Sequence, residues 1–311
     1  MNNHRITYKT LILLVVNICH IQGQTEMIKF DPTLDTLDIE VVKYVSTPTW
    51  RYSDQFTIKS NVILVSECKD STSILNWMIK ESHAYLENKV LELNQIDQKT
   101  ISVFDNLNIR LKLSKNGIIE ELINYQALVD SVVTRYSAID SLKRQGVEYD
   151  SSEINIDWRL FEYYFRVTSE PLIFLNFIFP EITSYFELNN KYLDLYEEYI
   201  DTVIDNYDRL ELLQIEMRNN TILVQSDRNV IEVECQFELT RDGCEELKRQ
   251  LENQVNRQTI FNINEFECQR SRKIRRYLYN KNRGYVYKLY EKETLNINNE
   301  PYYYWMEINV K

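Results

Sequence analysis

The chain has 311 residues, with only five glycines and five prolines, and its formal charge of −11 comes from 47 acidic and 36 basic residues. An acidic chain repels a phosphate backbone, which argues against general nucleic-acid binding, and so few glycines leave little scope for phosphate-cradling loops. The same composition, rich in Leu, Ile, Glu and Lys, favours long helices.

The N-terminus predicts a cleavable signal peptide over residues 1–23. Arg5 and Lys9 precede an apolar run over 11–16, and this order of charge and hydrophobicity is typical of a secretory leader. The run falls short of the ~20 apolar residues that cross a bilayer. We expect cleavage after Gly23 and a secreted or periplasmic mature protein. The alternatives are an uncleaved anchor and a buried N-terminal strand.

Residues 24–70 predict a β-rich N-terminal segment. The stretches 39–45 and 56–65 are rich in β-branched residues, and Pro32 and Pro48 punctuate them. Such runs, bounded by turn-forming residues, are typical of strands. We therefore expect at least two strands before the pattern changes.

Residues 71–217 predict a helical region. Apolar residues within 71–113, and again within 118–139, recur at steps of three and four, which is the spacing of one helix face. Since a turn signal at Gly117 separates the two stripes, we expect an antiparallel helical hairpin with coiled-coil-like packing. A further long helix is expected over 181–217.

Residues 218–311 predict a mixed C-terminal segment. Its expected elements are strands over 221–224, 230–239, 284–290 and 302–310 and a helix over 241–256. The predicted fold class is therefore α+β, with long amphipathic helices flanked by N- and C-terminal β-containing segments. We also raise the hypothesis that both ends share one sheet, with the helices as an insertion.

The cysteines predict disulfides. Removing Cys19 with the leader leaves four cysteines in an exported chain, which favours two disulfides in one of three connectivities. Zinc sites use closely spaced Cys or His residues, whereas these cysteines lie far apart, so we expect no metal site. The disulfide candidates are Cys68, Cys235, Cys244 and Cys268.

A basic segment near the C-terminus is the candidate binding site. It carries nine basic residues and one acid over 270–292. Clustered positive charge is typical of contacts with an anionic partner. The sequence does not identify the partner, and the candidates are an anionic polymer, a membrane surface or another envelope protein. The interpretation we favour is neutralisation by the chain's own acidic stretch over 181–216. The candidate residues are Arg270, Arg272, Lys273, Arg275, Arg276 and Tyr277.

Two other features invite a catalytic or metal-binding interpretation. His83 is the one histidine that remains after removal of the leader. Because no nucleophile motif accompanies it, we interpret it as a surface or packing residue. On the expected helix over 181–217, four acids share a face that suits Ca²⁺ or Mg²⁺, although we favour a solvated face. These acids are Glu198, Asp201, Asp205 and Asp208.

Together these features favour a non-catalytic exported protein that binds or scaffolds at the cell envelope or outside the cell. The sequence motifs argue against catalysis without deciding the question, assign no catalytic residue and imply no cofactor. The alternative is an exported hydrolase that acts on glycans, with an Asp/Glu acid–base pair facing across a cleft.

Overall fold

The computed structural model describes most of the chain after the leader. The described residues are 25–31, 36–48, 53–69, 72–86, 102–114, 117–144, 171–195, 197–207, 213–255, 272–297 and 300–311. The strands are β1 (Thr25–Ile28), β2 (Thr36–Pro48), β3 (Ser53–Lys69), β4 (Thr72–Leu86), β5 (Leu107–Leu113), β6 (Ile119–Leu122), β7 (Lys191–Asp194), β8 (Glu198–Tyr207), β9 (Leu213–Ser226), β10 (Val230–Leu239), β11 (Arg272–Asn280), β12 (Tyr285–Ile297) and β13 (Glu300–Val310). The helices are η1 (Ser102–Phe104), α3 (Tyr125–Arg144), α5 (Pro171–Ile178), α6 (Pro180–Phe186) and α7 (Arg241–Val255).

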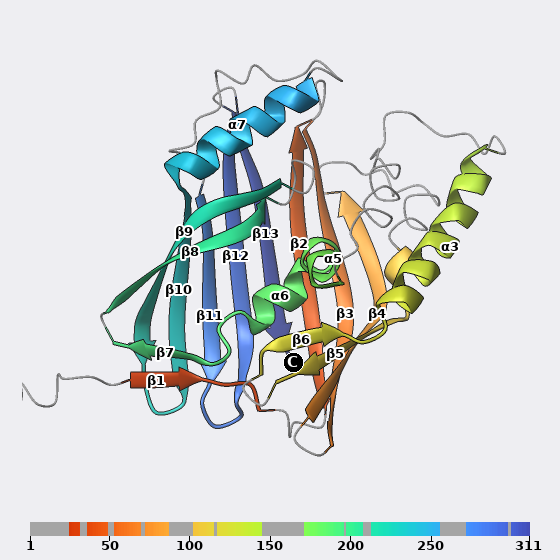
Figure 1. The fold of residues 1–311 in the computed structure, drawn as a ribbon. Coiled ribbons are helices and arrows are strands. Elements are labelled where there is room, and N and C mark those ends of the chain that lie inside the picture. The colour runs from red at the N-terminus through yellow and green to blue at the C-terminus, as the bar shows by residue number, and fades with distance from the viewer. Residues whose placement is uncertain are drawn as a thin grey trace, which may run out of the picture.

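One large antiparallel sheet dominates the fold (Figure 1). Its eleven strands follow the order β6-β5-β4-β3-β2-β13-β12-β11-β10-β9-β8, and β1 pairs separately with β7. The two ends of the chain meet inside this sheet, because β13 pairs with β2 in the register Met306↔Lys43. Both ends thus share one sheet, as the hypothesis proposed, but the helical insertion is wrong, because the middle of the chain also supplies strands to this sheet.

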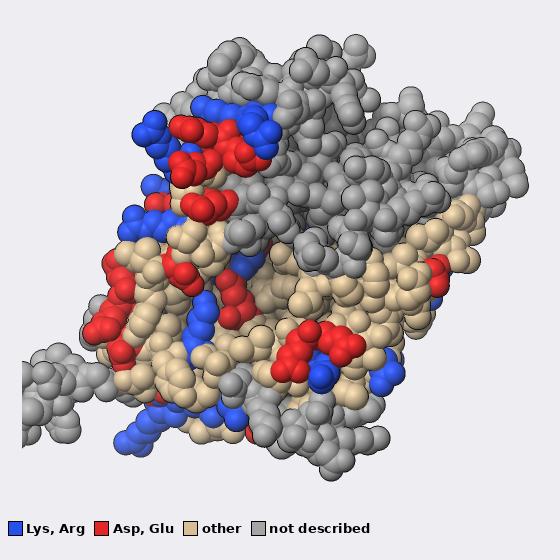
Figure 2. Space-filling model, viewed as in Figure 1, with Lys and Arg blue, Asp and Glu red and all other residues tan. Residues whose placement is uncertain are grey.

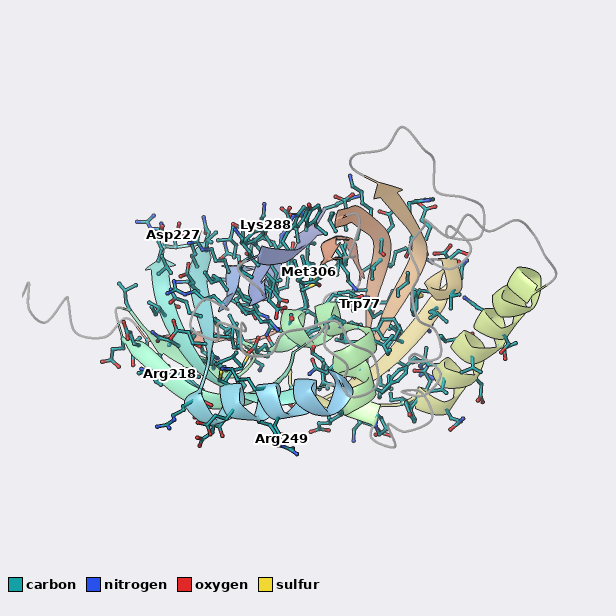
Figure 3. All side chains as sticks on the ribbon, turned by 90° about the horizontal axis from the view of Figure 1, so that it is seen from above. Trp77, Arg218, Asp227, Arg249, Lys288 and Met306 are labelled. Carbon is teal, nitrogen blue, oxygen red and sulfur yellow. The ribbon has the colours of Figure 1, made fainter. Side chains whose placement is uncertain are left out.

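The sheet curves around α5 and α6, which lie on its concave side (Figure 1). Figure 3 shows Trp77 and Met306 on the side of these helices and Lys288 on the opposite side of the sheet. Trp77 and Met306 are both 0% exposed, and the ring centroids of Trp77 and Tyr185 of α6 lie 5.9 Å apart. The hydrophobic core thus fills the space between the concave face and the two helices.

The predicted helix over 71–113 is wrong, because β4 and β5 lie there. β5 buries every second side chain, namely Leu107, Ile109, Leu111 and Leu113. A period of two is the signature of a strand with one buried face. Other apolar residues of the stretch also fall three or four positions apart, and this coincidence hides the strand period.

The second predicted stripe, over 118–139, is half correct. Its beginning forms β6, which pairs with β5, and a helix, α3, begins at Tyr125. This helix buries Leu128 and Val132 in the core. The predicted hairpin and coiled coil are wrong, because the stretch expected to supply the partner helix pairs as strands.

The predicted long helix over 181–217 is also wrong. α6 ends at Phe186, and Asn190 has a φ of 64°, which lies outside the helical region. The chain then continues as β7, β8 and β9. Tyr192 and Tyr199, which a helix would place on one face, therefore lie in different strands.

The predictions for the chain ends are better. The strands expected over 39–45 and 56–65 lie within β2 and β3, and those expected in the C-terminal segment match β9, β10, β12 and β13. The helix expected over 241–256 is α7, which lies against β9 and β10. The fold class is nevertheless mainly β rather than α+β with long helices. Among the described residues, no helix is long and apolar enough to cross a bilayer.

Candidate functional site

A group of charged side chains lies on the concave face of the sheet, and we call it the charged cluster. Its members are Lys43, Glu181, Glu187, Lys273, Arg275, Glu291 and Glu293. Glu291 is 1% exposed, Lys273 3% and Glu293 4%, so these charges are as buried as the apolar core around them. Burying a charge costs free energy unless ion pairs and hydrogen bonds offset it.

The strand register brings the cluster together. β11 alternates, so that Lys273, Arg275 and Tyr277 face inward and are buried, whereas Arg272 and Arg276 are exposed. Across the next strand pair, Lys273 lies opposite Glu293 and Arg275 opposite Glu291. Basic residues of one strand thus meet acidic residues of its neighbour on the buried face, an arrangement that stabilises cross-strand pairs.

Helix α6 supplies the other side of the cluster. Glu181, Ser184 and the residue after the helix, Glu187, are spaced three apart and therefore share a face. Lys43 Nζ lies 2.6 Å from Glu181 Oε2, and Ser184 Oγ donates to Glu291 Oε2 at 3.4 Å. This polar face crosses the sheet from β2 to β11.

The guanidinium of Arg275 is the centre of the cluster. Its Nε donates to Glu291 Oε2 and its Nη1 to Glu187 Oε2. The hydroxyl of Tyr277 donates to the same Glu187 oxygen at 2.8 Å. Arg275 Cζ also lies 4.9 Å from the ring centre of Phe237, within the range of a cation–π contact. The guanidinium is therefore fixed on several sides at once.

Two neighbouring groups titrate abnormally. Burial, and then the Glu187 carboxylate, raise the pKa of Tyr277 well above its usual value, so the phenol keeps its proton and remains a donor. Burial, followed by the same carboxylate, raises the pKa of Cys235 to about 12, so this thiol stays protonated. Neither group is prepared to act as a base or nucleophile near neutral pH.

The surface above the cluster is hollowed. Figure 2 shows acidic and basic side chains together in a recess of the concave side, between α6 and the edge formed by β8 and β9. On a protein surface a concave site with a few polar groups is the usual setting for a ligand. This recess is the best candidate site in the part of the chain that the structure describes.

The predicted basic site is divided by the sheet. Lys273, Arg275 and Tyr277 belong to the charged cluster, whereas Arg272 and Arg276 are exposed on the outer face, where Arg276 pairs with Glu234 at 2.5 Å. Arg270 lies outside the described residues. The neutralisation that the sequence favours occurs at Arg275, because Glu187 belongs to the acidic stretch over 181–216.

The other members of the cluster are not among the residues predicted from the sequence. Glu291 and Glu293 could have been predicted, because they alternate in the same way as the basic residues of β11. A turn at Gly284, which has a φ of 65°, separates the two stretches and allows them to pair as a hairpin. Lys43 and Glu181 carry no comparable signal, because the order of distant strands and the position of α6 bring them to the site.

The predicted pair of disulfides is wrong. Cys235 has a free thiol, is 0% exposed and contacts Thr221 Oγ1 at 3.5 Å. Cys244 is disulfide-bonded, but its partner, like the side chains of Cys68 and Cys268, lies outside the described part of the structure. No disulfide joins two cysteines whose side chains are described.

The other candidates are placed away from the charged cluster. His83 is exposed in β4, with Nε2 3.4 Å from Glu81 Oε2, which agrees with a surface role. Glu198, Asp201 and Asp205 lie in β8 rather than on a helix. The step of three from Glu198 to Asp201 places these two on opposite faces of the strand, and the side chain of Asp205 and all of Asp208 lie outside the described residues. No group of three His, Cys, Asp or Glu residues that suits a metal ion occurs in the described stretches.

Comparison with known proteins adds little. No protein-family model matches the chain, and no curated protein matches it significantly. Among solved structures, a porin-like protein from Bacteroides uniformis aligns over 88% of this chain and 95% of its own length, with 8% identity and a TM-score of 0.16. A likeness of this size carries no argument about fold or function, so the function must be argued from the charged cluster itself.

Proposed function

We propose that the chain is a non-catalytic binding protein whose ligand contacts the concave face of the sheet at the charged cluster. The observation that carries this proposal is the convergence of buried and half-buried charges from β2, α6, β11 and β12 around Arg275. Apolar residues of similar volume often replace buried ion pairs with no loss of stability. A cluster that served stability alone would therefore gain little from being charged, whereas a ligand site needs polar groups.

The arrangement of carboxylates supports binding over hydrolysis. Glu187 and Glu291 both accept hydrogen bonds from the guanidinium between them. A glycoside hydrolase instead needs two carboxyl groups that face the scissile bond, one of which carries a proton. The contacts of Arg275 thus favour the first of the two functions that the sequence left open.

Export remains part of this proposal. The leader over 1–23 lies outside the described residues, so its support is the pattern of charge and hydrophobicity in the sequence. Mass spectrometry of the protein isolated from its native host tests it directly. A first residue of Gln24 supports cleavage after Gly23, and an intact Met1 on cytosolic protein overturns export.

Binding at the cluster is tested with two matched double variants. Lys273→Met/Glu293→Leu removes one charge of each sign from residues that face each other inside. Lys288→Met/Glu307→Leu removes an ion pair of 2.7 Å on the outer face. Each variant and the parent chain are titrated calorimetrically with a panel of small carboxylates, neutral sugars and amino acids.

We expect the inner variant to lose affinity for the bound compound by at least about thirtyfold, as for a binding residue worth ~2 kcal/mol, and a cooperative thermal transition confirms that the variant is folded. The outer variant should bind like the parent chain. Equal affinity in both variants would place the ligand elsewhere and overturn the proposal, as would the absence of binding by any compound of the panel.

A further inference from the structure

The position next to Arg275 and Tyr277 has the geometry of a carboxylate-binding site. A guanidinium N–H from Arg275 and the phenolic O–H of Tyr277 converge on one oxygen of Glu187, with the phenol at 2.8 Å. Charge-assisted donors that converge in this way are the arrangement by which proteins hold carboxylates. Both donors are fixed, because Tyr277 is 0% exposed and the side chain of Arg275 is 8% exposed.

Glu187 is the least confined member of this arrangement. Its side chain is 21% exposed, whereas that of Glu291 is 1% exposed. Glu187 follows the last residue of α6, and its rotatable side chain can turn toward solvent while Tyr185 and Phe186 remain in the core. Removing the Glu187 carboxylate from Arg275 therefore requires a rotamer change and no displacement of the helix.

We propose that this position is a binding site for a carboxylate-bearing ligand and that Glu187 is its built-in competitor, so that the ligand binds by exchange with the Glu187 side chain. This inference rests on the proposed binding function. The exchange leaves the donors of Arg275 and Tyr277 with the same kind of acceptor. It also leaves the charge balance unchanged, because one carboxylate replaces another beside Lys273, Glu291 and Glu293.

The charge balance sets the class of ligand. The cluster holds four acids against three bases, so a polyanion would add negative charge to a site that already has an excess of it. A ligand with a single carboxylate adds no net negative charge, because it replaces the carboxylate of Glu187. The ligand is accordingly a small molecule with one carboxylate, and an acidic sugar and an acylated amino acid are the two sources to distinguish.

The test removes the competitor from the full chain. In Glu187→Ala the position is open, and sodium acetate should raise the melting temperature saturably above that seen with sodium chloride of equal concentration. The matched control, Glu197→Ala, removes an exposed acid ten residues away in the same stretch and should show no such difference. A tethered side chain competes at an effective concentration in the millimolar range or above, so Glu187→Ala should bind the preferred carboxylate at least about tenfold more tightly than the parent chain does.

Two probes separate the sources of the carboxylate. Tighter binding of D-glucuronate indicates an acidic sugar, and tighter binding of N-acetylalanine indicates an acylated amino acid; either supports the exchange. Glu187→Gln keeps a side chain in the position and should respond to acetate less than Glu187→Ala. If Glu187→Ala does not fold in chloride, refolding in acetate becomes the measurement, and recovery of the folded state supports the inference.

An acetate response equal in Glu187→Ala and Glu197→Ala, or no recovery in acetate, would overturn the inference. So would a ligand without a carboxylate whose binding depends on Lys273 and Glu293. That last result would leave the proposed binding function intact, so the two proposals can fail separately.

Discussion

Arg275 and Glu187 form an ion pair on the concave face although 88 positions separate them in the sequence. The pair joins the turn after α6 to β11, which lies two strands from β13, the central strand of the eleven-stranded sheet. It thereby links the helix that covers the concave face to the basic strand beneath. Several consequences of this arrangement, and of contacts elsewhere in the fold, are measurable.

Replacing Arg275 should destabilise the protein strongly. Arg275→Met leaves the carboxylates of Glu187 and Glu291 without the guanidinium between them, and loss of one partner from a buried pair costs about 3–5 kcal/mol. Arg276→Met is the matched control, because its side chain is 57% exposed and an exposed pair contributes about 0–1 kcal/mol. Urea unfolding of both variants measures the difference. Equal stabilities would show that Arg275 is not the structural centre of the cluster.

Gly284 should not tolerate a side chain. Its φ is 65°, and a Cβ at this position would lie 2.6 Å from the Cβ of Asp31, whose backbone N–H donates to Gly284 O at 2.7 Å. Gly284→Ala therefore combines an unfavourable backbone conformation with a clash, and should lower the free energy of unfolding by about 1–3 kcal/mol. Arg283→Ala in the same turn should change it by less than about 0.5 kcal/mol. A Gly284→Ala protein as stable as the parent chain would contradict the turn described here.

The Cys235 thiol should be unreactive in the folded protein. It is 0% exposed, and burial raises its pKa to about 12, so very little thiolate exists at pH 8. Iodoacetamide should modify Cys235 only after unfolding in guanidinium chloride, as read by peptide mass spectrometry. Modification in native buffer at the rate of a small-molecule thiol would be inconsistent with its position on the inner face of β10.

Acid should weaken the attachment of β1. The hydroxyl of Thr25, and then that of Tyr199, lower the pKa of Asp194, and this carboxylate connects β1 to β7. The pKa of Asp194 is lower in the folded protein than in the unfolded chain. Its contribution to the free energy of unfolding is therefore fully present above the unfolded pKa of about 3.9. It is lost as the pH falls through the folded value.

Asp194→Asn should therefore be less stable than the parent chain at pH 7, and the difference should shrink as the pH falls below the usual range of an aspartate. Glu197→Gln, three residues away, should show no such pH-dependent difference. Urea unfolding at neutral and acidic pH provides the comparison. A difference that stays constant with pH would rule out the charge of Asp194 as its cause.

The sequence predicted well where local pattern decides the structure. The β-branched stretches of β2 and β3 and the amphipathic helix α7 carry signals that do not depend on distant residues. It predicted poorly where the apolar residues fit two periods at once, as in the stretch that forms β4 and β5. There the pairing with neighbouring strands selects a strand over a helix, because each strand of the eleven-stranded sheet can bury its apolar face.

Half of the basic site could be predicted, because the clustering of charge is a local pattern. The sequence shows that basic residues cluster at 272–276. It does not show that they lie on a strand that divides them between two faces, or which of these faces is buried. Lys43 and Glu181 reach Arg275 only through the β2–β13 pairing and the position of α6. Such contacts depend on the order of the sheet, which no short stretch of sequence encodes.

The binding of a ligand at Arg275 is tested most directly by nuclear magnetic resonance of the arginine side chains. The Nε–H resonances of Arg275 and Arg276 are followed while D-glucuronate, N-acetylalanine or the compound found by calorimetry is added to the full chain. A saturable shift at Arg275, with Arg276 unchanged, is the predicted result. A shift confined to Arg276, or ligand binding that leaves Arg275 unchanged, would contradict a site on the concave face.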